Sequence, residues 1–516
     1  MAKRERKIKK PRILVVTPEI TYLPAGMGNM ANHLNAKAGG LADVSASLVA
    51  ALFDHGADVH VALPHYRRMF HMDVGRLISD ELRVYKSRLP DSRIHLAEDR
   101  CFYYRETVYS NYQNENPKLA LAFQREVINN IIPTVQPDLI HCNDWMTGLV
   151  PAAARRLGIP CLMTVHNIHT HHVTLSAIED AGVDAAEFWP SLYFTRVPAS
   201  YEETRGNNPV DLLASGVFAA HFINTVSPTF LDEICRGWFD FIPPYFRNEI
   251  IGKRNAGCAT GILNAPDDSY NPETDEALDA RYTAETHAAG KRANKLAFQA
   301  KMELEVDPDA ALFFWPSRLD PAQKGPQLLT DILFRMVSKF ADRKLQVAVV
   351  ANGQHQEAFH DVVRIHDLKD RVAVCNFDER LSRLGYAAAD FILVPSLFEP
   401  CGLPQMVGAI YGTLPVVHDT GGLHDTVEHL AADGASGNGF PFKVYGSEGL
   451  AWAMEQAMAF YAQPAERRAE QIARIMRESK ARFNHAVCAR AYMDIYETML
   501  NRPLVNPFPA AGRVGA

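Results

Sequence analysis

Runs of hydrophobic residues divide the first half of the chain into strands and helices. Residues 12–17 and 58–63 are short apolar runs typical of buried strands, and residues 41–55 between them carry apolar side chains at helical spacing. Gly56 ends that helical pattern. Two such strands joined by a helix make a βαβ unit, and the crossover predicts that the strands are parallel.

The alternation continues with predicted strands at residues 138–141 and 161–165, separated by a predicted helix at 146–157. Residues 168–260 are less regular, and we interpret them as helices and loops that cover one side of the first sheet. Turn-forming residues cluster at 264–272. This cluster is the expected domain boundary.

Strands and helices alternate again in the second half. The predicted elements there are a helix at 326–340 and strands at 313–315, 345–350, 372–375, 391–394 and 414–418. A helical stretch at 446–500 is longer than the second sheet needs, so part of it is expected to return to the first domain. The pattern as a whole predicts an α/β protein with two doubly wound, Rossmann-like domains.

At 516 residues with 47% hydrophobic content, the chain is too long for a single core. The predicted organisation has four parts: a basic disordered tail (1–10), an N-terminal Rossmann-like domain (11–265), a C-terminal Rossmann-like domain (266–480), and a C-terminal helix and tail (481–516) that returns toward the N-terminal domain.

Composition argues against several classes of protein. The net charge of -7 leaves no electrostatic footprint for nucleic acid, and the basic run 3–10 is interpreted as a solubilising tail. No stretch approaches the roughly 20 apolar residues that span a membrane, and the N-terminus lacks the apolar core of a signal peptide, so a cytoplasmic location is expected. The eight cysteines are scattered without a Cys-x-x-Cys pair, which favours reduced thiols.

Glu399 is the most informative single carboxylate. It lies in the turn 395–405, between the apolar strand that ends at Val394 and a helical pattern that resumes at Met406. The amides near Gly402 and Leu403 are therefore expected at a helix N-terminus, which attracts anions. The alternative is that Glu399 is a solvated turn residue.

Three further segments carry groups that suit a phosphorylated ligand. Lys37, Gly39 and Gly40 open the first helix, where glycines let the backbone approach a ligand and the lysine adds a point charge. Arg318 and Lys324 follow the strand that opens the second half and are suited to clamp a diphosphate. Their alternative is a pair of solvated loop cations. A second glycine-rich turn begins at residue 421, after the strand 414–418.

Two residues at strand ends of the first half are suited to bind sugar hydroxyls. His166 ends the strand 161–165 and Asp144 follows the strand 138–141. The alternatives are a core histidine and an N-cap of the following helix. His166, His169, His171 and His172 cluster in sequence, but their spacing matches no usual zinc site, and we predict no metal.

In this order, the segments resemble the bacterial glycogen synthase and plant starch synthase family, retaining glycosyltransferases of the GT-B fold, in which two domains face each other across a cleft. The similarity runs from about residue 13 to 496. The motifs that carry it include Lys37-Ala-Gly-Gly-Leu-Ala-Asp-Val, Asn143-Asp-Trp, Thr164-Val-His-Asn, Ser317-Arg-Leu, Gln323-Lys-Gly, Phe398-Glu-Pro-Cys-Gly-Leu and Gly421-Gly-Leu. The resemblance implies transfer of glucose from a nucleotide sugar to the non-reducing-end 4-hydroxyl of an α-1,4-glucan, with retention and without cofactor or metal. ADP-glucose is favoured as donor over UDP-glucose.

The resemblance also assigns residues. Those that match the family's catalytic and sugar-facing positions are Glu399, His166, Arg318, Lys324 and Asp144. Those that match its donor-binding positions are Lys37, Gly39, Gly40, Phe377, Cys401, Gly402, Leu403, Thr420, Gly421 and Gly422. Those expected on the acceptor side are Glu19 and Asn167. In this scheme the cations stabilise the leaving diphosphate, and Glu399 orients the glucose.

The chain also departs from the family pattern. Residues 20–36 form an insertion beside the expected acceptor channel, and Met146 replaces the family's usual histidine after Asp-Trp. Two alternatives therefore stay open. One is a catalytically weak glucan-binding scaffold, and the other is a GT-B glucosyltransferase with a different acceptor.

Overall fold

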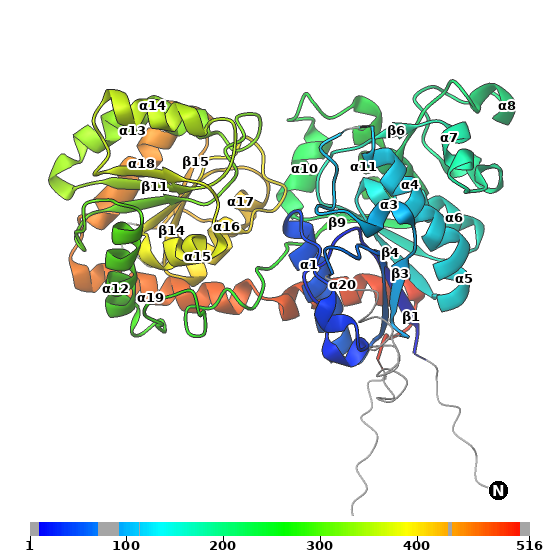
Figure 1. Ribbon diagram of the computed structural model, residues 1–516, viewed down its shortest axis with the longest axis horizontal. Helices are drawn as coiled ribbons and strands as arrows, with labels where there is room; N and C mark the ends of the chain where they lie inside the picture. The colour runs from blue at the N-terminus through cyan, green and yellow to red at the C-terminus, as the bar shows by residue number, and fades with distance from the viewer. Residues whose placement is uncertain (1–9, 71–91, 113, 432–435, 506–516) are drawn as a thin grey trace, which may run out of the picture. The chain divides into compact units, whose positions relative to one another are not determined.

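The computed structural model describes residues 10–70, 92–112, 114–431 and 436–505 (Figure 1). Contacts divide the chain into two compact units, and the second consists of Ser227–Leu231 and Leu263–Asn484. The remaining residues, including those from His485 onward, belong to the first. Except for Lys10, the predicted basic tail lies outside the described residues, as does the end of the C-terminal tail.

The first unit is built on a parallel sheet, which in the described residues has the strand order β3-β2-β1-β4-β5-β8-β9. The strands are β1 (Arg12–Val16), β2 (Asp58–Pro64), β3 (Ile94–Ala97), β4 (Leu139–Asn143), β5 (Cys161–Val165), β8 (Phe222–Thr225) and β9 (Ala259–Gly261). Every residue of β4 and β5 is buried, as expected for central parallel strands covered on both faces.

The helices of the first unit flank this sheet or cover its loops. The main ones are α1 (Gly40–Asp54), α4 (Asn116–Glu126), α6 (Val150–Arg156), α7 (Leu175–Asp180), α9 (Leu212–Ala219), α11 (Pro244–Asn255) and α20 (His485–Leu500). The helix α10 (Pro228–Arg236) is divided: its residues up to Leu231 are assigned to the second unit and the rest to the first. A short antiparallel pair joins β6 (His172–Val173) to β7 (Val210–Asp211).

Two sequence-based expectations for this unit are wrong. Residues 168–260 are not only helices and loops, because they contain β8 and begin β9, which extend the sheet. The predicted helix 146–157 is interrupted: a 3-10 turn at Trp145–Thr147 precedes α6. Gly148 lies at the break, where a Cβ would come within 1.8 Å of the Leu212 carbonyl oxygen, so the close approach of α9 shapes this turn.

The second unit holds a parallel sheet, with the order β12-β11-β10-β13-β14-β15 in the described residues. Its strands are β10 (Leu312–Trp315), β11 (Gln346–Val350), β12 (Val372–Cys375), β13 (Phe391–Val394), β14 (Leu414–His418) and β15 (Phe440–Phe442). Its main helices are α12 (His287–Lys301), α13 (Pro326–Lys339), α14 (Gln356–Ile365), α15 (Glu379–Ala388), α16 (Pro404–Ile410), α17 (Gly421–Thr426), α18 (Ser447–Tyr461) and α19 (Ala465–Arg482). The predicted α/β class with two doubly wound parallel sheets is confirmed.

The last helix, α20, belongs to the first unit although it follows a helix of the second. It packs beside α1, as the red and blue helices of Figure 1 show. The Tyr496 hydroxyl lies 2.7 Å from Nδ1 of His141 on β4, and the Tyr492 hydroxyl accepts from Nδ2 of Asn224 on β8 at 3.0 Å. The C-terminus therefore completes the polar part of the first unit's core.

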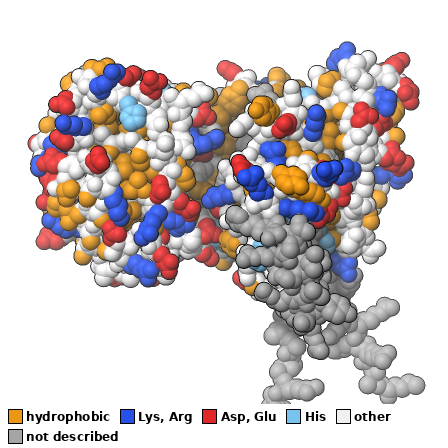
Figure 2. All heavy atoms as spheres, viewed as in Figure 1, with side chains coloured by type: hydrophobic (Ala, Val, Ile, Leu, Met, Phe, Trp, Pro, Cys, Tyr) orange, Lys and Arg blue, Asp and Glu red, His pale blue; other side chains and the backbone are white. Residues whose placement is uncertain are grey.

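Charged side chains of both signs cover the surface. On the face shown in Figure 2, basic and acidic groups are interspersed within each unit, in keeping with the small negative net charge of -7.

Candidate active site

The donor-side residues predicted from sequence lie at the carboxyl ends of strands in the second sheet. Arg318 and Lys324 follow β10, Phe377 follows β12, residues 399–403 follow β13, and residues 420–422 follow β14. From β10, the chain adds β11 and β12 on one side and β13, β14 and β15 on the other, so the strand order reverses between β10 and β13. Open α/β sheets bind ligands at such a switch point. The sheet therefore gathers these residues along one edge.

Glu399 and Lys324 form an ion pair at this edge. The Lys324 Nζ donates to Oε2 of Glu399 at 2.6 Å, and the Ser396 hydroxyl donates to the same oxygen at 2.8 Å. Only 6% of Glu399 is exposed, so it is not the solvated turn residue of the alternative reading. A buried carboxylate needs such partners because it has lost its water. The Lys324 ammonium therefore compensates the charge of the Glu399 carboxylate.

Backbone contacts hold the loops of these two residues together. The Leu397 amide donates to the Gln323 carbonyl at 2.8 Å. Gly325 has φ +72°, and a Cβ there would lie 2.5 Å from the Pro395 carbonyl oxygen. The turn after β10 and the turn after β13 are thus packed backbone to backbone, which places Lys324 against Glu399.

The glycine turn after β14 is packed just as closely against the Glu399 turn. The Gly422 amide donates to the Glu399 carbonyl at 2.9 Å, and a Cβ on Gly422 would lie 2.0 Å from the Cys401 carbonyl oxygen. Gly402 has φ +72°, in the left-handed region that favours glycine. Leu403 caps α16, so Gly402 and Leu403 do lie just before a helix, although a short one.

Arg318 and Phe377 are placed differently from the other candidates. Arg318 is exposed, and within the described ranges its side chain has no ion pair. Phe377 is 52% exposed. Asn352, which sequence reasoning missed, connects their loops: its carbonyl accepts from the Leu319 amide at 2.9 Å, and its Oδ1 accepts from the Phe377 amide at 3.0 Å.

In the first unit, Asp144 is a buried and strained residue at the end of β4. Its φ of 56° and ψ of −177° fall in a region that residues other than glycine rarely adopt. Its carboxylate accepts from the His166 amide at 2.7 Å and from Nδ2 of Asn167 at 3.1 Å, and it does not cap the following turn. Burial raises the pKa of Asp144 to about 7, although the hydrogen bonds oppose this rise.

His166 lies beside Asp144 at the end of β5. Its Nε2 is 2.9 Å from Oδ1 of Asn143, and burial lowers its pKa to about 3, so the imidazole is neutral at physiological pH. Asn143 in turn donates to the Val16 carbonyl at 3.1 Å. The structure thus brings Asp144, His166 and Asn167 together, and adds Asn143, which the Asn143-Asp-Trp motif contains.

The glycine loop before α1 already holds an internal anion. Oε2 of Glu19 accepts from the Ala38 amide at 2.6 Å and from the Gly39 amide at 3.0 Å. Glu19 is buried, and burial raises its pKa. Lys37 is paired with Asp43 at 2.8 Å. Glu19, predicted on the acceptor side, therefore supports the glycine loop directly. Sequence reasoning did not identify Asp43 as the partner of Lys37, and the only signal for it was its place in the same motif.

The insertion 20–36 is closed at its base. The backbones of Ile20 and Ala36 exchange hydrogen bonds of 2.9 and 2.7 Å, and Leu23, Met27 and Leu34 are buried. This closure keeps Glu19 beside the glycine loop despite the residues between them.

The histidines near the end of β5 pair with one another. Nε2 of His169 lies 3.3 Å from Nε2 of His171, and His172 lies 3.6 Å from a carboxylate oxygen of Asp211. In the described part of the chain, no group of three or more histidine, cysteine, aspartate or glutamate residues is arranged to hold a metal ion.

Comparison with known proteins first defines the class. The family model described as "Starch synthase catalytic domain" matches residues 12–241, and the model described as "Glycosyl transferases group 1" matches residues 310–459. Each of the two doubly wound units thus matches a glycosyltransferase model. The chain is a GT-B glycosyltransferase and, within that fold, a hexosyltransferase.

Individual relatives then define the family. The chain is 31% identical to the glycogen synthase of Syntrophotalea carbinolica, over 83% of this chain and 90% of the relative. It is 31% identical to the glycogen synthase of Bacillus licheniformis, over 89% of this chain and 95% of the relative. The chain belongs to the glycogen and starch synthase family.

A solved structure agrees with the fold. The catalytic domain of starch synthase IV from Arabidopsis thaliana, solved with ADP and acarbose, matches with a TM-score of 0.74 and 24% identity, over 96% of this chain and all of that one. Among the described residues, no helix is long and apolar enough to cross a membrane.

Proposed function

We propose that the protein transfers glucose from ADP-glucose, with retention, to the 4-hydroxyl at the non-reducing end of an α-1,4-glucan. Relatives named glycogen synthase and a starch synthase structure containing ADP support the choice of substrates. UDP-glucose is the second candidate donor, because one protein of similar fold is solved with UDP and glucose.

The observation that carries the proposal is the ion pair of the partly buried Lys324 with the buried Glu399 at the switch point of the second sheet. In the reaction, the bond from the sugar C1 to the phosphate oxygen breaks and a bond from C1 to the acceptor oxygen forms. The departing diphosphate gains negative charge, which Lys324 and the exposed Arg318 stabilise. The acceptor proton passes to the leaving phosphate oxygen, so no protein nucleophile is needed.

Glu399 is then free to bind the donor sugar. When a diphosphate engages the Lys324 ammonium, the carboxylate of Glu399 can accept hydrogen bonds from glucose hydroxyls instead. We assign the rest of the donor site to Phe377 on the base and to the backbone of residues 401–403 and 420–422.

In the first unit we assign substrate contacts to two groups. The Lys37, Gly39 and Gly40 loop contacts the donor diphosphate, and His166 and Asp144 contact sugar hydroxyls. A neutral imidazole and a carboxylate suit hydroxyls because they can accept hydrogen bonds from them.

Turnover assays with both donors, each with and without a glucan primer, test the reaction. We expect glucose transfer from ADP-glucose to the primer with retention. Glu399→Ala is expected to lower kcat by roughly 10²–10³-fold, since it removes one preorganised polar contact to the reacting sugar. Nucleotide binding should stay nearly unchanged because Lys324 keeps its charge.

The matched control is Glu379→Ala, which removes an exposed carboxylate from α15 of the same unit and should leave turnover unchanged. Wild-type turnover by Glu399→Ala would remove Glu399 from the site. Glucan binding without turnover of either donor would favour the scaffold alternative. Transfer to an acceptor other than α-1,4-glucan would favour the alternative of a GT-B glucosyltransferase with a different acceptor. The insertion 20–36 is the feature of this chain that motivates this alternative.

A further inference from the structure

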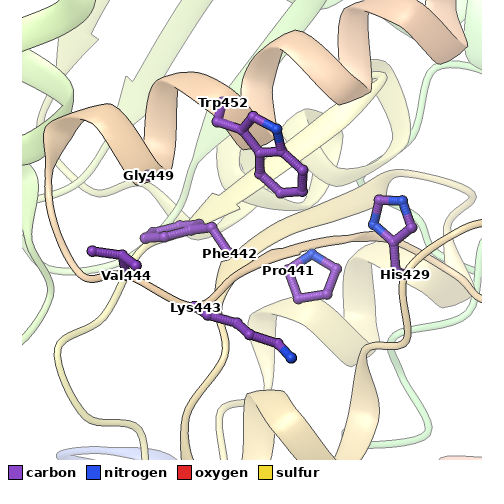
Figure 3. A pocket seen from close by; sticks show the side chains of 7 residues that line it. All are labelled: His429, Pro441, Phe442, Lys443, Val444, Gly449 and Trp452. Atoms are coloured by element: carbon purple, nitrogen blue, oxygen red, sulfur yellow. The ribbon is translucent and has the colours of Figure 1, made fainter.

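A cavity of about 440 Å³ lies in the second unit, away from the Glu399 turn along the sheet (Figure 3). Its lining includes His429, Pro441, Phe442 and Lys443, from β15 and the segments beside it, and Trp452 of α18. β15 is the edge strand of the sheet, two strands from β13, which carries Glu399. The volume is within the range of small-molecule sites, about 300–1,000 Å³.

The walls of this cavity are flat and apolar. Figure 3 shows the indole of Trp452 on one side, with Pro441 and Phe442 across from it. Trp452 is 47% exposed although it is the largest apolar side chain in the lining. The imidazole of His429 is stacked with the indole, with ring centroids 6.2 Å apart and planes 23° apart. Such surfaces suit a ligand with a planar ring.

The polar side-chain groups of the lining are all hydrogen-bond donors or able to donate. They are the indole N–H of Trp452, the ammonium of Lys443 and the imidazole of His429, and within the described residues none of the three has a hydrogen bond or ion pair. In Figure 3 the Lys443 side chain runs past Pro441. Among the residues that the structure describes, no carboxylate, amide or hydroxyl side chain is part of the lining.

The polar groups of this lining select among ligands. A neutral sugar would find, among the described lining side chains, only the His429 imidazole to accept from its several hydroxyl groups. A cation would be repelled by Lys443. An anion that carries a planar ring can satisfy the donors, pair with the ammonium and cover the indole at once.

We propose that this cavity binds a nucleoside phosphate, with the base on Trp452 and the phosphate paired with Lys443. Stacking of a base on an aromatic side chain stabilises the complex, and the phosphate adds a salt-dependent contribution. This site is separate from the donor site and its existence does not depend on the proposed reaction.

Equilibrium binding of AMP to the full chain tests the proposal. We expect two sites per wild-type chain and one in Trp452→Ala. Lys443→Ala should weaken the same site by at least about tenfold and remove most of its salt dependence. AMP should quench the fluorescence of Trp452, which is one of five tryptophans. The part of the quenching that is absent in Trp452→Phe comes from Trp452 and therefore reports this site alone.

The matched controls are Trp238→Ala, which removes another exposed indole from the first unit, and Lys369→Ala, which removes an exposed lysine elsewhere in the second. Both should bind two AMP molecules. Adenosine and ribose 5-phosphate should each bind the site more weakly than AMP, because each offers only one of its two features.

Unchanged AMP binding in both Trp452→Ala and Lys443→Ala would overturn the proposal. A single AMP site in the wild type that is lost in Trp452→Ala would uphold the cavity site and would count against AMP binding at the donor site. Quenching of Trp452 by maltose and not by AMP would also overturn the proposal, and would show that the cavity takes a sugar instead.

Discussion

Glu399, Asp144 and Glu19 are all buried carboxylates, but different partners hold them. Glu399 is neutralised by the Lys324 ammonium, whereas Asp144 and Glu19 accept from backbone amides at strand ends and at the start of α1. Amide dipoles compensate a buried charge less than an ammonium does. Burial therefore dominates at Asp144 and Glu19 and raises their pKa values.

Asp144 should make the stability of the first unit depend on pH. Its pKa is about 7 in the folded protein and 3.8 ordinarily, so between these values the folded state binds the proton more readily than the unfolded state. The unfolding free energy should therefore fall as pH rises through that window, by up to about 4 kcal/mol at about 1.4 kcal/mol per pKa unit. Asp144→Asn has no carboxyl group at this position, so its unfolding free energy should not show this fall with rising pH.

Denaturant unfolding at several pH values measures the effect. The stability of Asp144→Asn relative to wild type should increase from pH ~4 to pH ~8, a comparison that cancels the contributions of other groups such as His141 and His166. Asp309→Asn, at an 84% exposed side chain, should show a constant difference. A flat difference for Asp144→Asn as well would contradict the prediction.

The pair of Lys324 and Glu399 should couple in stability. Lys324→Ala leaves the Glu399 carboxylate buried, with the Ser396 hydroxyl as its one remaining side-chain partner among the described residues, and we expect a loss of about 3 kcal/mol of unfolding free energy. The double variant Lys324→Ala/Glu399→Ala should cost less than the two single variants together, by about 1–3 kcal/mol. Urea unfolding of the four proteins measures this coupling, and strictly additive costs would show that the pair is not formed in solution.

At the scale of elements, the site depends on three turns that approach one another through their backbones. The turns after β10, β13 and β14 leave no room for a Cβ at Gly325 or Gly422. Strands placed next to each other in the sheet bring the turns to the same edge, and glycines let them touch. The position of Glu399 therefore depends on the turns after β10 and β14 as well as on its own turn after β13.

Gly422→Ala should disrupt this arrangement. Its Cβ would lie 2.0 Å from the Cys401 carbonyl oxygen, which forces α17 away from the Glu399 turn and strains the hydrogen bond from the Gly422 amide. We expect a loss of at least about 2 kcal/mol of stability and of roughly 10²-fold in kcat/KM. Gly446→Ala is the matched control in the same unit, since a Cβ there meets no atom within 4 Å. Equal activity of the two variants would contradict the role given to this contact.

At the scale of the whole molecule, the chain leaves the first unit, forms the second and returns as α20. His141 on β4 has Tyr496 and Thr164 as partners of its two ring nitrogens, at 2.7 and 2.6 Å. The first unit's core is thus incomplete until the C-terminus is present.

Tyr496→Phe should destabilise the first unit alone. It leaves Nδ1 of the buried His141 without its partner, which costs about 1–3 kcal/mol. Calorimetry should show a lower unfolding temperature for the transition of the first unit and an unchanged one for the second. Tyr112→Phe, at a 74% exposed tyrosine, should change neither. A shift in the transition of the second unit would contradict the assignment of α20.

The sequence predicted much of the architecture and less of the site. Buried strands such as β1, β11 and β13 consist almost entirely of apolar residues, and these were identified. β3, β8, β9 and β15 of the two sheets were missed, because short strands flanked by irregular segments carry little periodic signal. Asn352 was also missed, because its contacts join loops that only the sheet brings together. Ser396 and Asp43 lie within the quoted turn and motif of Glu399 and Lys37, but the sequence did not show that they are the partners of these two residues.

Hydrophobic spacing and ordered motifs by themselves determined the α/β class and the family, because both are recorded in residue type and order along the chain. Only the tertiary structure decided that Glu399 is paired with Lys324, that Glu19 occupies the glycine-loop amides and that Tyr496 bonds to His141. These contacts depend on strand order and on burial. Both arise when distant segments pack together, so no local stretch of sequence contains them.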